Sequence, residues 1–126
     1  MNVKTMGADQ TATNKSGNNW VAVMQATSTR SRLYKLSISP LAGMAADVYV
    51  WIFNVAAGAA ATSAAPVCVR LVSAGVCDSW DFGPDGSLFE NGIFVALSTV
   101  APTDATTTVT GSGNNKVILK ADIRVG

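Results

Sequence analysis

The chain has 126 residues, a length that suits one domain, and a net charge of +1. This charge balance argues against electrostatic binding to nucleic acid or to an anionic membrane. Histidine is absent, which removes the commonest general base and the commonest transition-metal ligand. Apolar residues make up 48% and charged residues 13% of the chain, and the charged share is about half the usual one. We therefore expect contacts within an assembly to cover part of the surface.

The sequence predicts neither a signal peptide nor a transmembrane helix. Its first 20 residues are polar and lack the apolar segment of a signal peptide. No run of about 18 apolar residues follows. Two cysteines, Cys68 and Cys77, are too few for a disulfide-rich scaffold. We expect synthesis in a reducing cytoplasm and two buried free thiols, with a disulfide across a predicted hairpin at residues 66–82 as the alternative.

The first segment in chain order, residues 1–19, is predicted to be a flexible arm. It is polar, rich in Asn, Thr and Gly, and has no periodicity. Such an arm is either disordered or ordered by lying across a neighbouring subunit. The folded domain is expected to span residues 20–126.

Alternation of apolar and polar residues predicts the strands of this domain. They are expected at residues 20–27, 32–39, 47–55, 66–72, 76–82, 92–98 and 116–125, with a further short strand at 106–110. The strand at 32–39 should carry Tyr34, Leu36 and Ile38 on one face, and the strand at 92–98 should be buried mainly on one face. A small-residue loop is expected at 56–65, with one helical turn as the alternative. Seven or eight short strands predict an all-β fold, a single antiparallel β-sandwich or jelly roll.

The strand at residues 47–55 is apolar on both faces. Its two faces carry Val48, Val50 and Ile52, and Tyr49, Trp51 and Phe53. A strand of this kind needs cover on both sides. We expect one face to point into the core and the other to meet a loop, the arm or another subunit. The candidate interface residues are Tyr49, Trp51, Phe53 and Trp20.

Turn residues separate the strands in the segment at residues 80–98. Pro84 pre-sets φ for a turn, and Gly86 accepts positive φ. We expect the strands on either side of this turn to pair with each other. The segment also contains most of the only acidic cluster, which consists of Asp78, Asp81, Asp85 and Glu90, with Asn91 beside them. Its spacing fits no EF-hand loop, so we interpret these residues as turn and solvent-facing residues, with a calcium site as the alternative.

No catalytic, cofactor or metal site is predicted. No histidine is present to activate a serine or a cysteine, and the phosphate-binding pattern G-x-x-x-x-G-K-[ST] does not occur. The arginines are spread out without interleaved aromatic residues, which disfavours a nucleic-acid interface. Aromatic residues at strand spacing indicate core or interface, with a glycan-stacking platform as the alternative. We expect a protein that is not an enzyme.

The order of motifs between residues 32 and 124 carries a resemblance. A strand at 48–54 is followed by an alanine-rich loop at 56–65 and a Pro-led strand at 66–72. The motifs that follow are Asp81-Phe82-Gly83-Pro84-Asp85-Gly86, Phe89, Asn91-Gly92-Ile93, Ser98-Thr99, Ala101-Pro102-Thr103 and Ala121-Asp122. This order resembles a group of small virion proteins of tailed bacteriophages.

The resemblance implies a β-sandwich protein that decorates the phage head. It implies the major capsid protein as partner and a homo-oligomer at a symmetry axis, with a trimer favoured. It also implies a place on the capsid surface after synthesis in the host bacterial cytoplasm. A protein that binds only the assembled shell stabilises that shell by mass action. The alternative is a tail or fibre accessory domain that binds a host-surface glycan through Trp80 and the loop at 103–115.

Overall fold

The computed structural model describes residues 7–17, 19–40, 47–57, 66–73, 76–98 and 117–126. This part of the chain contains strands and no helix, and all its strand pairs are antiparallel, which confirms the predicted all-β class. The strands are β1 (Gln10–Thr13), β2 (Lys15–Ser16), β3 (Asn19–Trp20), β4 (Val23–Thr27), β5 (Ser31–Pro40), β6 (Val48–Phe53), β7 (Cys68–Val72), β8 (Asp78–Asp81), β9 (Ser87–Phe89), β10 (Ile93–Ser98) and β11 (Val117–Val125). Among these residues no helix is long and apolar enough to cross a bilayer.

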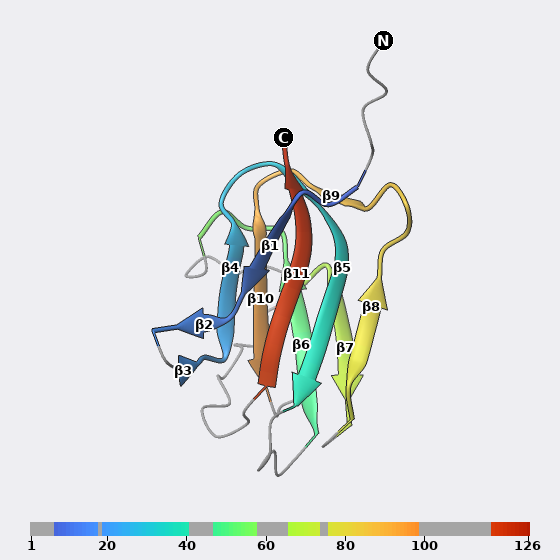
Figure 1. The fold of residues 1–126 in the computed structure, drawn as a ribbon. Helices are drawn as coiled ribbons and strands as arrows, with labels where there is room; N and C mark the ends of the chain where they lie inside the picture. Colours follow the sequence, from blue (N-terminus) through green and yellow to red (C-terminus); the bar gives the residue numbers. More distant parts are fainter. Residues whose placement is uncertain (1–6, 18, 41–46, 58–65, 74–75, 99–116) are drawn as a thin grey trace.

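Two antiparallel sheets lie one in front of the other (Figure 1). The β5 sheet has the order β1-β11-β5-β8, and β9 also pairs with β5. The β6 sheet has the order β4-β10-β6-β7, and β2 and β3 form a separate ribbon. Side chains from both sheets form one core, which includes Leu36, Ile38, Val50, Ile52, Val95, Leu97, Leu119 and Ile123. The arrangement is β-sandwich-like, as expected, and a jelly-roll order of connections stays a prediction.

The predicted strands differ in how well alternation anticipated their burial. In β11 the alternation is confirmed, because Val117, Leu119 and Ala121 are buried while Lys120 is exposed. In β10 all six residues are buried, so the expectation of burial mainly on one face is wrong. This strand lies in the middle of the β6 sheet between β4 and β6, and its second face packs in an additional apolar cluster.

A bulge in β5 changes which residues enter the core. Asp122 of β11 is opposite Lys35, whereas the next residue, Ile123, is opposite Leu33. Tyr34 is therefore the extra residue, and the face of the strand shifts by one at this point. Leu33 lies in the core with Leu36 and Ile38. The prediction that Tyr34 shares their face is wrong, since uninterrupted alternation carries no sign of the bulge.

The N-terminal segment is partly a strand of the β5 sheet. Residues 10–13 form β1 and pair with β11, so that Gln10 is opposite Ile123 and Thr13 is opposite Lys120. Residues 15–16 pair with residues 19–20. The expectation of a flexible arm over residues 1–19 is therefore corrected for residues 10–13, which pair along the edge of β11, and for residues 15–16, which pair with residues 19–20. Residues 1–6 lie outside the described part.

The turn at residues 83–86 forms as predicted, but its two flanking strands do not pair with each other. The Gly86 N–H donates to the Gly83 carbonyl over 3.2 Å, and both glycines have positive φ. The Asp81 carboxylate accepts the Gly83 N–H over 2.8 Å, which is a turn role as expected. Strands β8 and β9 instead pair with successive parts of β5. Pairing of β8 and β9 with the long strand β5 thus replaces the expected local hairpin.

Strands β7 and β8 also do not form the expected hairpin. β7 is the last strand of the β6 sheet, and β8 is the last strand of the β5 sheet. Cys68 and Cys77 are both free; Cys68 is half-buried, whereas Cys77 is exposed rather than buried. Burial raises the pKa of the Cys68 thiol. The turn residues 74–75, the loop residues 58–65 and the predicted strand at 106–110 lie outside the described part.

This difference in exposure predicts unequal thiol reactivity. A disulfide reagent such as Ellman's reagent will modify Cys77 of the native protein rapidly and Cys68 slowly, because Cys68 is less accessible and forms less thiolate at a given pH. The Cys77→Ser variant will lose the fast phase, and denaturant will abolish the difference between the two thiols. Equal native rates in the Cys68→Ser and Cys77→Ser variants would contradict the assignment.

Candidate interaction surfaces

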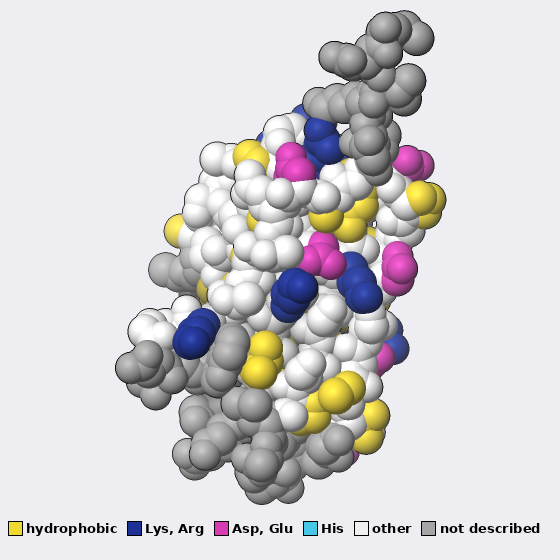
Figure 2. Space-filling model, viewed as in Figure 1, with side chains coloured by type: hydrophobic (Ala, Val, Ile, Leu, Met, Phe, Trp, Pro, Cys, Tyr) yellow, Lys and Arg dark blue, Asp and Glu magenta, His cyan; other side chains and the backbone are white. Residues whose placement is uncertain are grey.

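The outward face of the β5 sheet is polar. Its side chains alternate with those of the core, and charges of both signs are interspersed on it (Figure 2). The residues at these outward positions include Thr11, Thr13, Lys35, Ser37, Ser79, Asp81, Lys120 and Asp122. Such a face is suited to water, as is usual for one side of an antiparallel sheet.

The outward face of the β6 sheet is free of charge along its strands. The register places Val23, Gln25, Tyr49, Trp51, Phe53, Val69, Leu71, Phe94, Ala96 and Ser98 on it. Its centre is a second apolar cluster, which we call the outer cluster and which consists of Trp51, Phe53, Val55, Phe94 and Ala96. The rings of Trp51 and Phe53 stack with centroids 6.0 Å apart, and Phe53 and Phe94 lie 6.1 Å apart. The two sheets therefore present chemically different outward faces.

The predicted interface residues divide into three groups. Trp51 and Phe53 are 1% and 0% exposed, so the chain itself already buries them. Tyr49 is half-buried and packs against the outer cluster. Trp20 lies in β3 opposite Lys15, away from the β6 sheet order, and its side chain lies outside the described part. The structure places Tyr49, Trp51 and Phe53 on one face of the β6 sheet, as predicted. Their contact with another molecule stays a prediction.

Within the described part of the chain, two buried polar atoms on this face have no hydrogen-bond partner, the indole Nε1 of Trp51 and the side-chain oxygen of Gln25. The Gln25 amide nitrogen, in contrast, donates to the carbonyls of Thr27 and Val55 over 2.7 Å and 3.0 Å. A buried group without a partner costs about 1–3 kcal/mol.

The accessible apolar residues of the β6 sheet lie towards its edges. Leu71 in β7 is 49% exposed, Val67 directly before β7 is 53% exposed, and Val23 in β4 is 43% exposed. Alternation along the predicted strand at 66–72 places Val67 and Leu71 on one side, but nothing in it identifies them as surface residues. The pattern from which they could have been found is the run PVCVRLV, which has apolar residues at every second position.

Arg70, Asp78 and Glu90 form ion pairs within the chain. The Arg70 guanidinium bonds the Asp78 carboxylate through Nε over 2.8 Å and through Nη2 over 3.3 Å. It also lies 5.5 Å from the centre of the Trp80 ring, which stacks on Phe82. Glu90 pairs with Arg30 over 3.2 Å. Among the described residues, no three His, Cys, Asp or Glu side chains gather in a metal-binding group.

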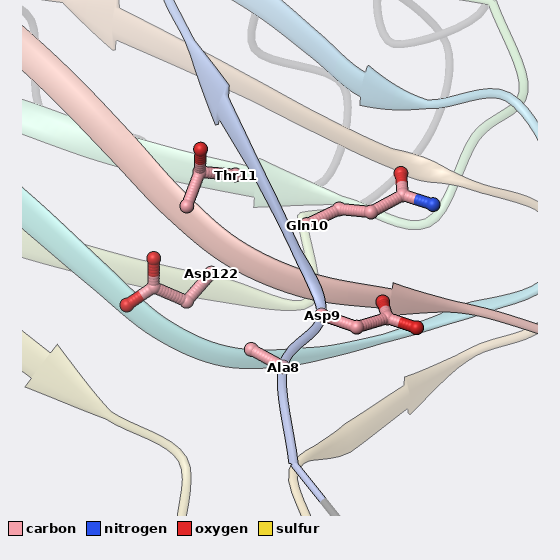
Figure 3. Close-up of a pocket in the computed structure, with 5 residues that line it drawn as sticks. All are labelled: Ala8, Asp9, Gln10, Thr11 and Asp122. Atoms are coloured by element: carbon pink, nitrogen blue, oxygen red, sulfur yellow. The ribbon is translucent and has the colours of Figure 1, made fainter.

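An open hollow of about 420 Å³ lies beside β1. It is lined by Ala8, Asp9, Gln10, Thr11 and Asp122. The carboxylates of Asp9 and Asp122 point to opposite sides of the β1 backbone, and Gln10 points away from Asp122 (Figure 3). A ligand site needs a few convergent polar groups. These side chains diverge, so the hollow does not have the character of a binding site.

The described fold and its surfaces define an all-β protein of two antiparallel sheets with one polar and one apolar outward face. Comparison of the chain with protein-family models, with curated proteins and with solved structures finds no match.

Proposed function

We propose that the protein is a structural virion protein of a tailed bacteriophage, a decoration protein that binds the major capsid protein of the assembled head. It acts as a homo-oligomer, with a trimer favoured, on the capsid surface, and has no catalytic role. The order of motifs between residues 32 and 124 supports the virion assignment. The finer fold that we propose with it is a jelly-roll β-sandwich.

The apolar side chains that stay exposed towards the edges of the charge-free β6-sheet face, Val23, Val67 and Leu71, are the observation that carries a role in assembly. The chain itself already buries the centre of this face. Antiparallel sheets with one face in water place polar residues there, as the β5 sheet does with Lys35, Lys120 and Asp122. The β6 sheet places Tyr49 and Leu71 at the corresponding positions beside the outer cluster. In the proposed complex the β6 sheet therefore faces the capsid and neighbouring subunits, and the β5 sheet faces solvent.

Binding of this kind stabilises the shell without chemistry. A ligand that binds the assembled state alone, at a concentration 100 times its dissociation constant, stabilises that state by about 2.7 kcal/mol per site. Many equivalent sites on one shell multiply this effect. Because the contact is apolar, we expect binding to depend little on salt concentration.

Co-sedimentation with empty heads of the phage that encodes the protein tests this proposal. We expect the wild-type protein to sediment with heads, and to do so at both low and high salt. The Tyr49→Asp variant places a charge on the outward face of the β6 sheet and should abolish binding. The matched control, Thr13→Asp, places the same charge on the outward face of the β5 sheet and should bind normally. A wild-type protein that stays in the supernatant would refute the proposal.

The glycan-binding alternative has less support from the described residues. It relied on Trp80 as an exposed stacking surface, but Trp80 packs against the core and Phe82, and Arg70 lies over its ring. The loop at 103–115 lies outside the described part. The decoration role is therefore the one that we develop.

A further inference from the structure

The strand orders of the two main sheets of the described fold end in four strands, which differ in character as edges. The edges are β1 and β8 in the β5 sheet and β4 and β7 in the β6 sheet. An edge strand offers unpaired backbone groups to another strand unless charge or polarity blocks the approach. β8 begins and ends with aspartate, and β1 exposes polar residues. In β4, Gln25 is bonded to backbone carbonyls of its own chain.

β7 is the edge with the most exposed apolar surface. Val67 and Leu71 are about half exposed. Leu71 lies on the outward face with Val69, and Val67, directly before β7, continues the same alternation. Proline and charged side chains commonly protect such an edge. The one charged residue of β7 is Arg70, which is opposite Val50 on the inward side of the sheet and is held by Asp78 and the Trp80 ring. Its charge therefore does not guard the outward face of the strand.

We propose that β7 pairs antiparallel with β7 of a second copy of this chain, around a two-fold axis at Val69. This pairing places Val67 opposite the second copy's Leu71, so that the two most exposed apolar side chains of the edge cover each other. Cross-strand apolar pairs of this type stabilise antiparallel sheets. The two β6 sheets become one eight-stranded antiparallel sheet, a size that sheets commonly reach.

Charge is what makes a second copy the fitting occupant. In the register around Val69, Arg70 is opposite the second copy's Cys68, so the two arginines are not paired with each other. Each Arg70 already has its own carboxylate in Asp78, at 2.8 Å. A strand that pairs with β7 therefore meets no uncompensated charge, and it does not need to carry an opposite charge of its own. β7 itself is a strand that meets this requirement, with complementary Val67 and Leu71 at equal distances from its centre.

The pairing is distinct from the proposed trimer and does not rest on capsid binding. A contact that uses the same patch on both partners joins copies in pairs and cannot close a three-fold ring. If a separate contact builds a trimer, the β7 pairing joins two trimers. The purified protein should therefore contain an even number of copies.

The mass of the purified protein in solution tests the pairing. We expect sedimentation equilibrium to show an even number of copies for the wild type, and half that mass for the double variant Val67→Lys with Leu71→Lys. The matched control is Leu88→Lys with Val125→Lys, which changes two exposed apolar residues of the β5 sheet and should keep the wild-type mass. Far-ultraviolet circular dichroism checks that both variants fold. A wild-type mass of one or three copies, or an unchanged mass in the β7 variant, would overturn the proposal.

Disulfide cross-linking tests the register independently. In a background with Cys68→Ser and Cys77→Ser, Val69→Cys places one thiol at the two-fold axis, directly opposite its counterpart. Mild oxidation should then link two chains about a hundredfold faster than in the matched variant Val23→Cys on the β4 edge, because the effective concentration within a pair is millimolar. Equal rates at the two positions would show that β7 does not pair in this way. Because neither test includes phage heads, failure here is separable from failure of the decoration role.

Discussion

A Gly92→Ala variant will be destabilised by about 3 kcal/mol or more, since it combines backbone strain with steric overlap. Gly92 has a φ of +151°, in a region that residues with a side chain rarely adopt. A Cβ at this position would lie 2.6 Å from the Val55 carbonyl oxygen and 2.7 Å from the Thr27 carbonyl oxygen. Both obstacles are backbone atoms, which side-chain rearrangement does not remove.

The surroundings of Gly92 make relief of this overlap costly. The next residue, Ile93, begins β10 and donates its N–H to the Thr27 hydroxyl over 3.1 Å. That hydroxyl also bonds the Ser31 hydroxyl over 2.6 Å. The Gln25 amide bonds the same two carbonyls that the new Cβ would meet. Moving either carbonyl would therefore disturb the start of β10, the end of β4 and the residues after β6 together.

Thermal unfolding followed by tryptophan fluorescence measures the effect. We expect the melting temperature of Gly92→Ala to fall by about 10 °C or more. The matched control is Gly83→Ala, where φ is +89° but nothing lies within 4 Å of the added Cβ, so only a backbone cost of about 1–2 kcal/mol applies. Similar losses in the two variants would show that the close carbonyls around Gly92 do not determine its stability.

Alternation predicted the long strands but not their partners. β6, β7, β10 and β11 fall within their predicted ranges, and β5 extends one residue beyond its predicted range at each end, because each has apolar residues at every second position. The pairing of β8 and β9 with β5 was missed, since local turn chemistry at residues 83–86 is compatible both with a hairpin and with two segments along one neighbour. The bulge at Tyr34 was missed for a similar reason, as it depends on the register with β11.

The candidate surface was predictable in its location and not in its exposure. The alternation of Tyr49, Trp51 and Phe53 was sufficient to identify a second apolar face. Burial of Trp51 and Phe53 depends on long-range contacts that a single strand does not encode. The same holds for Arg70, whose sequence neighbours are apolar but whose partner Asp78 lies on a strand of the other sheet. The exposed edge at Val67 and Leu71 emerges only when the strand order is known.

Replacement of Asn14 by alanine is expected to have the second large effect, although no motif singles out this residue within its polar segment. Asn14 is 2% exposed and lies between β1 and β2. Its side-chain nitrogen donates to the carbonyls of Val21 and Val117, both over 2.8 Å. Its side-chain oxygen accepts the Leu119 N–H over 2.8 Å. The Asn14 side chain thus connects the N-terminal segment to the first residues of β11 and to Val21, which precedes β4.

Loss of these three bonds leaves partners of Asn14 unsatisfied in a buried site. At about 1–3 kcal/mol for each such group, we expect Asn14→Ala to cost about 3 kcal/mol or more. Native-state hydrogen exchange should show faster exchange of the β1 amides and of Leu119. The matched control is Asn54→Ala, which removes one exposed bond from the Asn91 N–H and should cost about 1 kcal/mol or less. If β1 amides exchange equally in both variants, then β1 is held by its pairing with β11 alone, and Asn14 does not secure the N-terminal segment to the sheet.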